Sequence, residues 1–342
     1  MRSFISSFKP ILIAAAIIAS LEVVFSFFKP NPAFSDFIVM APIDREKITN
    51  IFIHEKIRLL GEMNATELFV GDSSTFYGID PRIVTEVAPE SAAINLGCCA
   101  VSGFRGYRLI AEAIMKTNPN IRDVMLGITP YYVPSETYEN GQLADSIDKN
   151  YVGRWAGWET PSSAFRLAIT NGVYAGQFVN TFLPERVVPY WDRFEVFWPN
   201  VEHLRDTLGW MPRPGVAVSD NLTGKCEFNA LERTSNWFAK NETLLGRELE
   251  SFAKFARAKG VRLWLITNPV ACRIEGSSSA KAFEEEIQKF LAAYPEVRQP
   301  MPIFRVWPDS LFLDPWHLSR EGAALNSREI GKAIHDKRLA DQ

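Results

Sequence analysis

The chain of 342 residues carries a formal net charge of -3 at pH 7, and 47% of its residues are hydrophobic and 23% charged. This composition is typical of a globular protein with one large domain or two small ones, and the near-neutral charge speaks against nucleic-acid binding. Its four cysteines and four histidines lack the spacing of zinc ligands. A disulfide between Cys226 and Cys272 is compatible with the sequence, which does not require one.

The first predicted element is an apolar run, residues 10–28, flanked by basic residues. It just reaches the roughly 20 residues needed to cross a bilayer, although Glu22 inside it would cost roughly 2.5–3.5 kcal/mol at the bilayer centre. We interpret residues 1–30 as an uncleaved membrane anchor. A cleaved signal peptide, with small residues at Ala33 and Ser35, is the alternative. The positive N-terminal flank places the rest of the chain outside the cytoplasm.

Residues 31–66 are predicted to link this anchor to the main domain. Charged and apolar residues alternate in the part from 40 to 65, which is compatible with a helix that holds the domain near the membrane surface. A long flexible stalk is the alternative.

From residue 67 onward the pattern is that of an α/β protein. Short apolar runs predict strands at residues 67–71, 91–97, 123–128 and 261–267, and helical patterns cover 107–116, 242–259, 280–293 and 319–335. This alternation predicts a three-layer α/β/α domain over residues 67–342, with a parallel sheet between layers of helices. Because such sheets bind ligands at the carboxyl ends of their strands, the polar residues that follow each run are expected to form the site.

An irregular insertion, about residues 133–240, separates the third and fourth strands. It contains six of the nine tryptophans, namely Trp155, Trp158, Trp191, Trp198, Trp210 and Trp237. A loop-rich subdomain needs aromatic side chains to build a core, which is one explanation. The alternative is a substrate surface, since flat aromatic faces suit sugar rings or an acyl chain.

Three residues have the chemistry of a serine nucleophile with its base and acid. Ser73 follows the first strand in "LFVGDSST", while Asp314 and His317 lie three residues apart in "LFLDPWHLSREGA". An Asp-x-x-His spacing can turn the carboxylate toward Nδ1 of the imidazole and leave Nε2 free to face a serine. The alternative is a capped helix start, with Ser319 as N-cap and Glu321 in the first turn. Capping does not account for His317.

Three motifs in this order resemble the SGNH/GDSL hydrolase superfamily. They are "VGDSS" (70–74), "INLGCCAVSG" (94–103) and "DPWHLSREGA" (314–323). With the predicted anchor, the chain is most similar to membrane-anchored bacterial members that O-acylate exopolysaccharides and cell-wall polymers. These include the alginate acetylation proteins and the D-alanyl transfer protein of teichoic acid. The resemblance implies Ser73 as nucleophile, His317 as base and Asp314 as its orienting acid, with Ser74 one residue past the family's serine.

The resemblance also implies an oxyanion hole. Its donors would be the backbone N–H of Ser73 and that of a glycine in the second motif, either Gly97 or, our preference, Gly103. The third motif of the family normally contains an asparagine that donates to the oxyanion, and Thr129 stands in its place here, followed by Pro130. Thr129 is a candidate donor through its hydroxyl, and a turn residue before a proline is the alternative. Loss of one oxyanion donor costs on the order of 2.7–4 kcal/mol where it has been measured.

The function implied is that of an extracytoplasmic acyl transferase or esterase, in the periplasm or at the cell surface. It would move an acetyl-like O-acyl group to or from a glycan through an acyl-enzyme on Ser73, without a cofactor. The membrane, an acyl donor, a glycan acceptor and a membrane-bound acyltransferase are the partners implied. A catalytically impaired glycan-binding or assembly protein and a secreted lipase are the alternatives.

Overall fold

The structure is a computed structural model, and it describes the chain in several stretches. These are residues 61–129, 204–213, 231–272 and 278–341, with isolated positions at 17, 20, 53, 56, 57, 59, 60, 144, 147 and 226. Except for residues 17 and 20, all of them belong to one compact unit, Phe52–Arg154 and Asn200–Gln342.

The predicted membrane anchor lies outside the described residues, apart from Ile17 and Ser20, which are both helical. Among the helices that the structure does describe, none combines the length and the apolar character needed to span a bilayer. The aromatic insertion also lies largely outside the described residues.

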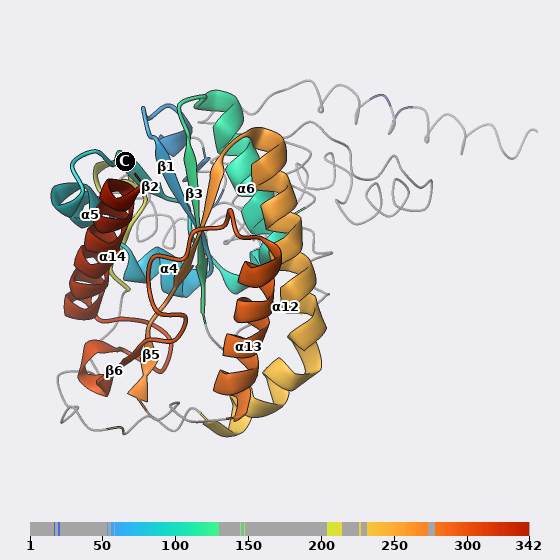
Figure 1. Ribbon diagram of the computed structural model, residues 1–342. Helices are drawn as coiled ribbons and strands as arrows, with labels where there is room; N and C mark the ends of the chain where they lie inside the picture. The colour runs from blue at the N-terminus through green and yellow to red at the C-terminus, as the bar shows by residue number, and fades with distance from the viewer. Residues whose placement is uncertain are drawn as a thin grey trace, which may run out of the picture. The chain divides into compact units, whose positions relative to one another are not determined.

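A four-stranded parallel sheet forms the centre of the unit, in the order β2-β1-β3-β4 (Figure 1). The strands are β1 (Glu67–Gly71), β2 (Ala93–Asn95), β3 (Asp123–Ile128) and β4 (Arg262–Thr267). Nearly every strand residue is buried, which explains why the strands read as continuous apolar runs. A second, two-stranded parallel sheet pairs β5 (Val270–Ala271) with β6 (Val306–Trp307).

Helices lie on both faces of the main sheet, which confirms the predicted α/β class (Figure 1). On one face α14 (Arg320–Ala340) packs against α5 (Pro81–Val87) and α4 (Ser73–Gly78). On the other face α6 (Gly103–Thr117) contacts α12 (Leu231–Lys259), which packs against α13 (Ser278–Ala293). The core between sheet and α14 includes Phe69, Met125, Trp264, Ile330 and Ile334.

The N-terminal side of the unit includes a helical stretch within the segment predicted as a linker. Ile53, Lys56, Ile57 and Leu60 are helical and buried, with the spacing that places them on one face of a helix. The last part of residues 31–66 therefore packs within the compact unit rather than outside it.

Candidate active site

Ser73 begins the short helix α4 at the carboxyl end of β1. Asp72 is the N-cap of this helix, because its carboxylate accepts the N–H of Ser74 at 2.9 Å and that of Thr75 at 3.3 Å. Ser73 is half-buried while Ser74 is buried. The turn from strand to helix therefore leaves Ser73 partly exposed and buries Ser74.

Two glycines let α4 approach the sheet closely. A Cβ at Gly71 would lie 2.3 Å from Oγ1 of Thr75, and one at Gly127 would lie 2.1 Å from the same atom. The Thr75 side chain therefore occupies the space that side chains on β1 and β3 would fill. This packing fixes the height of α4, and with it Ser73, above the carboxyl ends of the two central strands.

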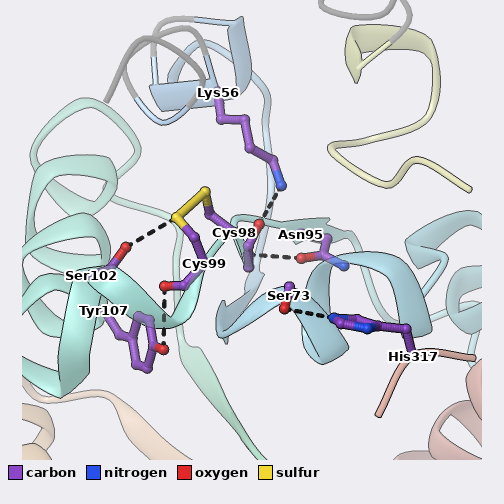
Figure 2. The surroundings of a disulfide bond; sticks show 9 residues. Lys56, Ser73, Asn95, Cys98, Cys99, Ser102, Tyr107 and His317 are labelled. Carbon is purple, nitrogen blue, oxygen red and sulfur yellow. Dashed lines mark hydrogen bonds between the residues drawn. A yellow bond between two sulfur atoms is a disulfide. The ribbon is translucent and has the colours of Figure 1, made fainter. Parts of the chain in front are cut away.

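The structure brings the three predicted catalytic residues together. Oγ of Ser73 lies 2.8 Å from Nε2 of His317 (Figure 2), and Nδ1 of His317 lies 2.9 Å from both carboxylate oxygens of Asp314. Oδ1 of Asp314 also accepts the N–H groups of Trp316 and His317, each at 2.9 Å. With Nδ1–H donating to the carboxylate, Nε2 is left to accept the serine proton.

Helix capping at this site accompanies the triad rather than replacing it. Ser319 is the N-cap of α14, and its hydroxyl accepts the N–H of Gly322 at 3.1 Å. Glu321 lies in the first turn. The loop 314–317 is thus held at one end by Asp314 and at the other by Ser319, and the imidazole of His317 faces Ser73.

The pKa of His317 is lowered to about 4, chiefly by burial and then by the positive charge of Arg213, while the carboxylate of Asp72 opposes both. Burial also raises the pKa of Asp72, against hydrogen bonds from Thr129 and from the N–H of Thr75. The imidazole is therefore neutral at neutral pH, which is the state in which a general base accepts a proton.

Asn95, which the sequence did not single out, braces the nucleophile helix. It is fully buried, and its Nδ2 donates to the carbonyls of Thr75 at 2.9 Å and Ile79 at 2.7 Å, with a longer contact of 3.4 Å to Phe76. Its Oδ1 accepts the N–H of Gly97 at 2.8 Å. One amide thus ties the end of β2 to the carbonyl end of α4.

The predicted oxyanion donors differ in how free their N–H groups are. The N–H of Gly97 donates to Asn95, and that of Gly103, which has a φ of 60°, donates to the carbonyl of Ala100. The N–H of Ser73 has no acceptor among the residues that the structure describes. Of the three backbone donors, Ser73 alone is therefore already available to an oxyanion.

Thr129 lies at the end of β3, where the resemblance places an asparagine. The side chain is buried, its Oγ1 accepts from Nδ2 of Asn268 at 3.2 Å, and it hydrogen-bonds the carboxylate of Asp72. Asn268 also donates to Oγ1 of Thr75 at 3.1 Å. In this structure the Thr129 hydroxyl therefore supports the N-cap of α4. Asn268 was not predicted, although an asparagine directly after a buried strand is a signal that could have found it.

Two disulfides involve all four cysteines. One joins Cys226 and Cys272, the pairing with which the sequence is compatible. The second joins the adjacent Cys98 and Cys99 in the loop between β2 and α6, close to Asn95 and Ser73 (Figure 2). The N–H of Cys98 donates to the carbonyl of Gly71 at 3.1 Å, so this loop is attached directly to the strand that leads to Ser73.

No protein-family model matches the chain, and no curated protein matches it significantly. Within the described stretches, no group of three His, Cys, Asp or Glu side chains is placed to hold a metal ion. The geometry of Ser73, His317 and Asp314 is therefore what the functional argument rests on.

Proposed function

We propose that the protein is a serine-dependent acyl transferase or esterase with an SGNH/GDSL-type domain. One observation carries the proposal. Ser73 and His317 are 244 positions apart in sequence, yet their Oγ and Nε2 atoms lie 2.8 Å apart, and the opposite side of the same imidazole faces Asp314. Chance packing of a surface histidine would not also supply an orienting carboxylate and a nucleophile at the start of a helix.

The reaction follows from this geometry. Oγ of Ser73 attacks the acyl carbonyl as His317 Nε2 takes the hydroxyl proton, and Asp314 stabilises the imidazolium that forms. His317 then returns the proton to the departing alcohol, which leaves the acyl group esterified to Ser73. In the second half, Nε2 removes a proton from a sugar hydroxyl or from water, whose oxygen attacks the acyl-enzyme. His317 then gives that proton to Oγ of Ser73 as the bond between Oγ and the acyl group breaks.

The setting we propose is a membrane-anchored domain outside the cytoplasm, with a glycan as the acyl acceptor. The apolar N-terminal run and its basic flank support the anchor, and the resemblance to polysaccharide-acylating proteins supports the acceptor. The disulfide bonding of all four cysteines favours an oxidising compartment.

A second candidate function is a glycan-binding or assembly protein that keeps the fold without turnover. The observation that favours it is the state of the oxyanion donors, since the N–H groups of Gly97 and Gly103 and the hydroxyl of Thr129 all have partners. The complete triad favours the enzyme, because a binding protein has no use for a serine hydrogen-bonded to a charge-oriented base.

Labelling with a fluorophosphonate probe tests the proposal on the full-length chain. We expect covalent labelling of the wild type at Ser73, loss of labelling in Ser73→Ala, and retention in the matched control Ser74→Ala. The same preparations should hydrolyse p-nitrophenyl acetate with the same pattern. An unlabelled and inactive wild type would refute the enzyme and favour the binding protein, whereas labelling that persists in Ser73→Ala would refute the nucleophile.

A further inference from the structure

The segment 204–213 lies within the predicted insertion and reaches Asp314 and His317 through Arg213. A tight turn anchors it to the sheet. The carbonyl of Leu208 accepts the N–H of Asn95, the last residue of the edge strand β2, at 2.8 Å. Leu208 and Gly209 both have positive φ, 55° and 91°. A Cβ at Gly209 would lie 2.0 Å from the carbonyl oxygen of Asn95, so only glycine lets the segment lie this close to the strand.

The next residues hold the segment against the nucleophile helix. Trp210 is buried, and its indole Nε1 donates to the carbonyl of Tyr77 in α4 at 2.9 Å. The Thr207 hydroxyl donates to the carbonyl of Trp210, which closes the turn. The backbone is thus fixed on both β2 and α4 three residues before Arg213.

Arg213 completes the hydrogen bonding of the catalytic carboxylate. Its Nη1 donates to Oδ2 of Asp314 and lies 2.9 Å from Nδ1 of His317. Oδ1 accepts the N–H groups of Trp316 and His317. The imidazole Nδ1 contacts both oxygens, and the guanidinium donates to Oδ2. A carboxylate has about four acceptor positions, and these four donors occupy them.

We propose that Arg213 is a positioning residue of the triad. It orients Asp314 through Oδ2 of that carboxylate and places a positive charge beside His317. The inference deepens the proposed function and rests on it. It assigns a part in the chemistry to a segment within the insertion, through a residue that lies more than one hundred positions from Asp314.

The charged and titratable groups that face His317 come from three parts of the chain. Asp314 lies in its own loop, Asp72 and Tyr77 belong to the turn and helix of the nucleophile, and Arg213 belongs to the segment 204–213. After burial, the charge of Arg213 is the second cause that lowers the pKa of His317, and Asp72 raises it. Arg213 therefore keeps the base unprotonated, and able to act, at more acidic pH.

The test is the pH dependence of kcat/KM for ester hydrolysis by the full-length protein. In Arg213→Gln we expect the acid limb to move to higher pH, with kcat/KM at pH 5 falling about threefold or more relative to the variant's own plateau. Arg205→Gln is the matched control, because Arg205 is an exposed arginine of the same segment, and its limb should coincide with that of the wild type. A limb that stays in place in Arg213→Gln, with or without a uniform loss of activity, would overturn the inference.

Arg213→Lys separately tests whether Arg213 orients Asp314, and it replaces Arg213→Gln as the test if that variant does not fold. It keeps the charge but loses the planar fork, so we expect an unmoved acid limb and a lower plateau kcat with an unchanged KM. An unaltered plateau would refute the orienting role. Absence of fluorophosphonate labelling in the wild type would instead refute the proposed function, so the two failures are distinguishable.

Discussion

Replacing Asn95 with aspartate tests how the edge of the sheet supports the nucleophile helix. The substitution is isosteric, so it leaves no cavity, and the retained Oδ1 can still accept the N–H of Gly97. The new oxygen would instead face the carbonyls of Thr75 and Ile79, which Nδ2 now contacts at 2.9 and 2.7 Å. Two hydrogen bonds become two repulsive contacts in a fully buried position.

The magnitude follows from the two carbonyls that lose their donor. A buried polar group without a partner costs about 1–3 kcal/mol, and the carboxylate adds its own desolvation, so we expect a loss of about 3–5 kcal/mol in the free energy of unfolding. For a domain of this size that corresponds to a fall in Tm of about 6–20 °C. Because α4 carries Ser73, the rate of fluorophosphonate labelling should fall as well.

Thermal and urea unfolding of Asn95→Asp, followed by circular dichroism, give the comparison. Asn120→Asp is the matched control, since Asn120 is exposed and its side-chain amide donates to Asn64, which is also at the surface. We expect this control to stay within about 0.5 kcal/mol of the wild type. If Asn95→Asp is no less stable than Asn120→Asp, the bracing role of the amide is wrong.

Three further predictions concern stability. Asp123 accepts hydrogen bonds from Arg262 and Trp264 at the opposite end of the strands from Ser73. Asp123→Asn should therefore lower the free energy of unfolding by about 3–5 kcal/mol and leave the rate of fluorophosphonate labelling at 25 °C unchanged. A slower labelling rate would show that the two ends of the sheet do not act independently. The pKa of His317 lies near 4 in the folded state, below its ordinary 6.5. The neutral imidazole therefore contributes fully to the free energy of unfolding above pH 6.5, and this contribution declines as the pH falls toward 4. Between pH 7 and 4.5 the free energy of unfolding of the wild type should fall by about 2 kcal/mol more than that of His317→Gln. Equal losses of stability in urea titrations would contradict the lowered pKa of His317. The disulfide of Cys226 closes a loop with a sequence separation of 46, so its removal by paired serine substitutions should cost about 4 kcal/mol, and an unchanged urea midpoint would contradict this.

Strands whose boundaries coincide with changes in polarity could be predicted from the sequence. The bounds of β1 and β3 agree with the prediction because each is a short apolar run that ends at a turn residue. The second strand is shorter than predicted, Ala93–Asn95, because Asn95 turns its side chain back to bond the N–H of Gly97. The helix α4 was not predicted, since six residues are too few to show a helical period.

The triad was within reach of the sequence, whereas its supporting residues were not. Ser73 and the Asp314–His317 pair each carry a local pattern, a turn after a strand and an Asp-x-x-His loop. Arg213 has no local pattern, because its role depends only on a contact across 101 positions of sequence with Asp314. The adjacent disulfide was not predicted either, since spacing rules for cysteines address pairs that are separated along the chain.

The glycine pair beneath Thr75 has a consequence for how this protein can change over evolutionary time. Since a side chain at Gly71 or Gly127 would collide with Thr75, the position of Ser73 is set by the sheet, and these two glycines tolerate little substitution. The positive charge beside His317 comes from a different part of the chain, the segment 204–213. The close contact of this segment with β2 depends on Gly209. Sequence change in the segment 204–213 can therefore alter the charge around His317 while Ser73 stays where it is.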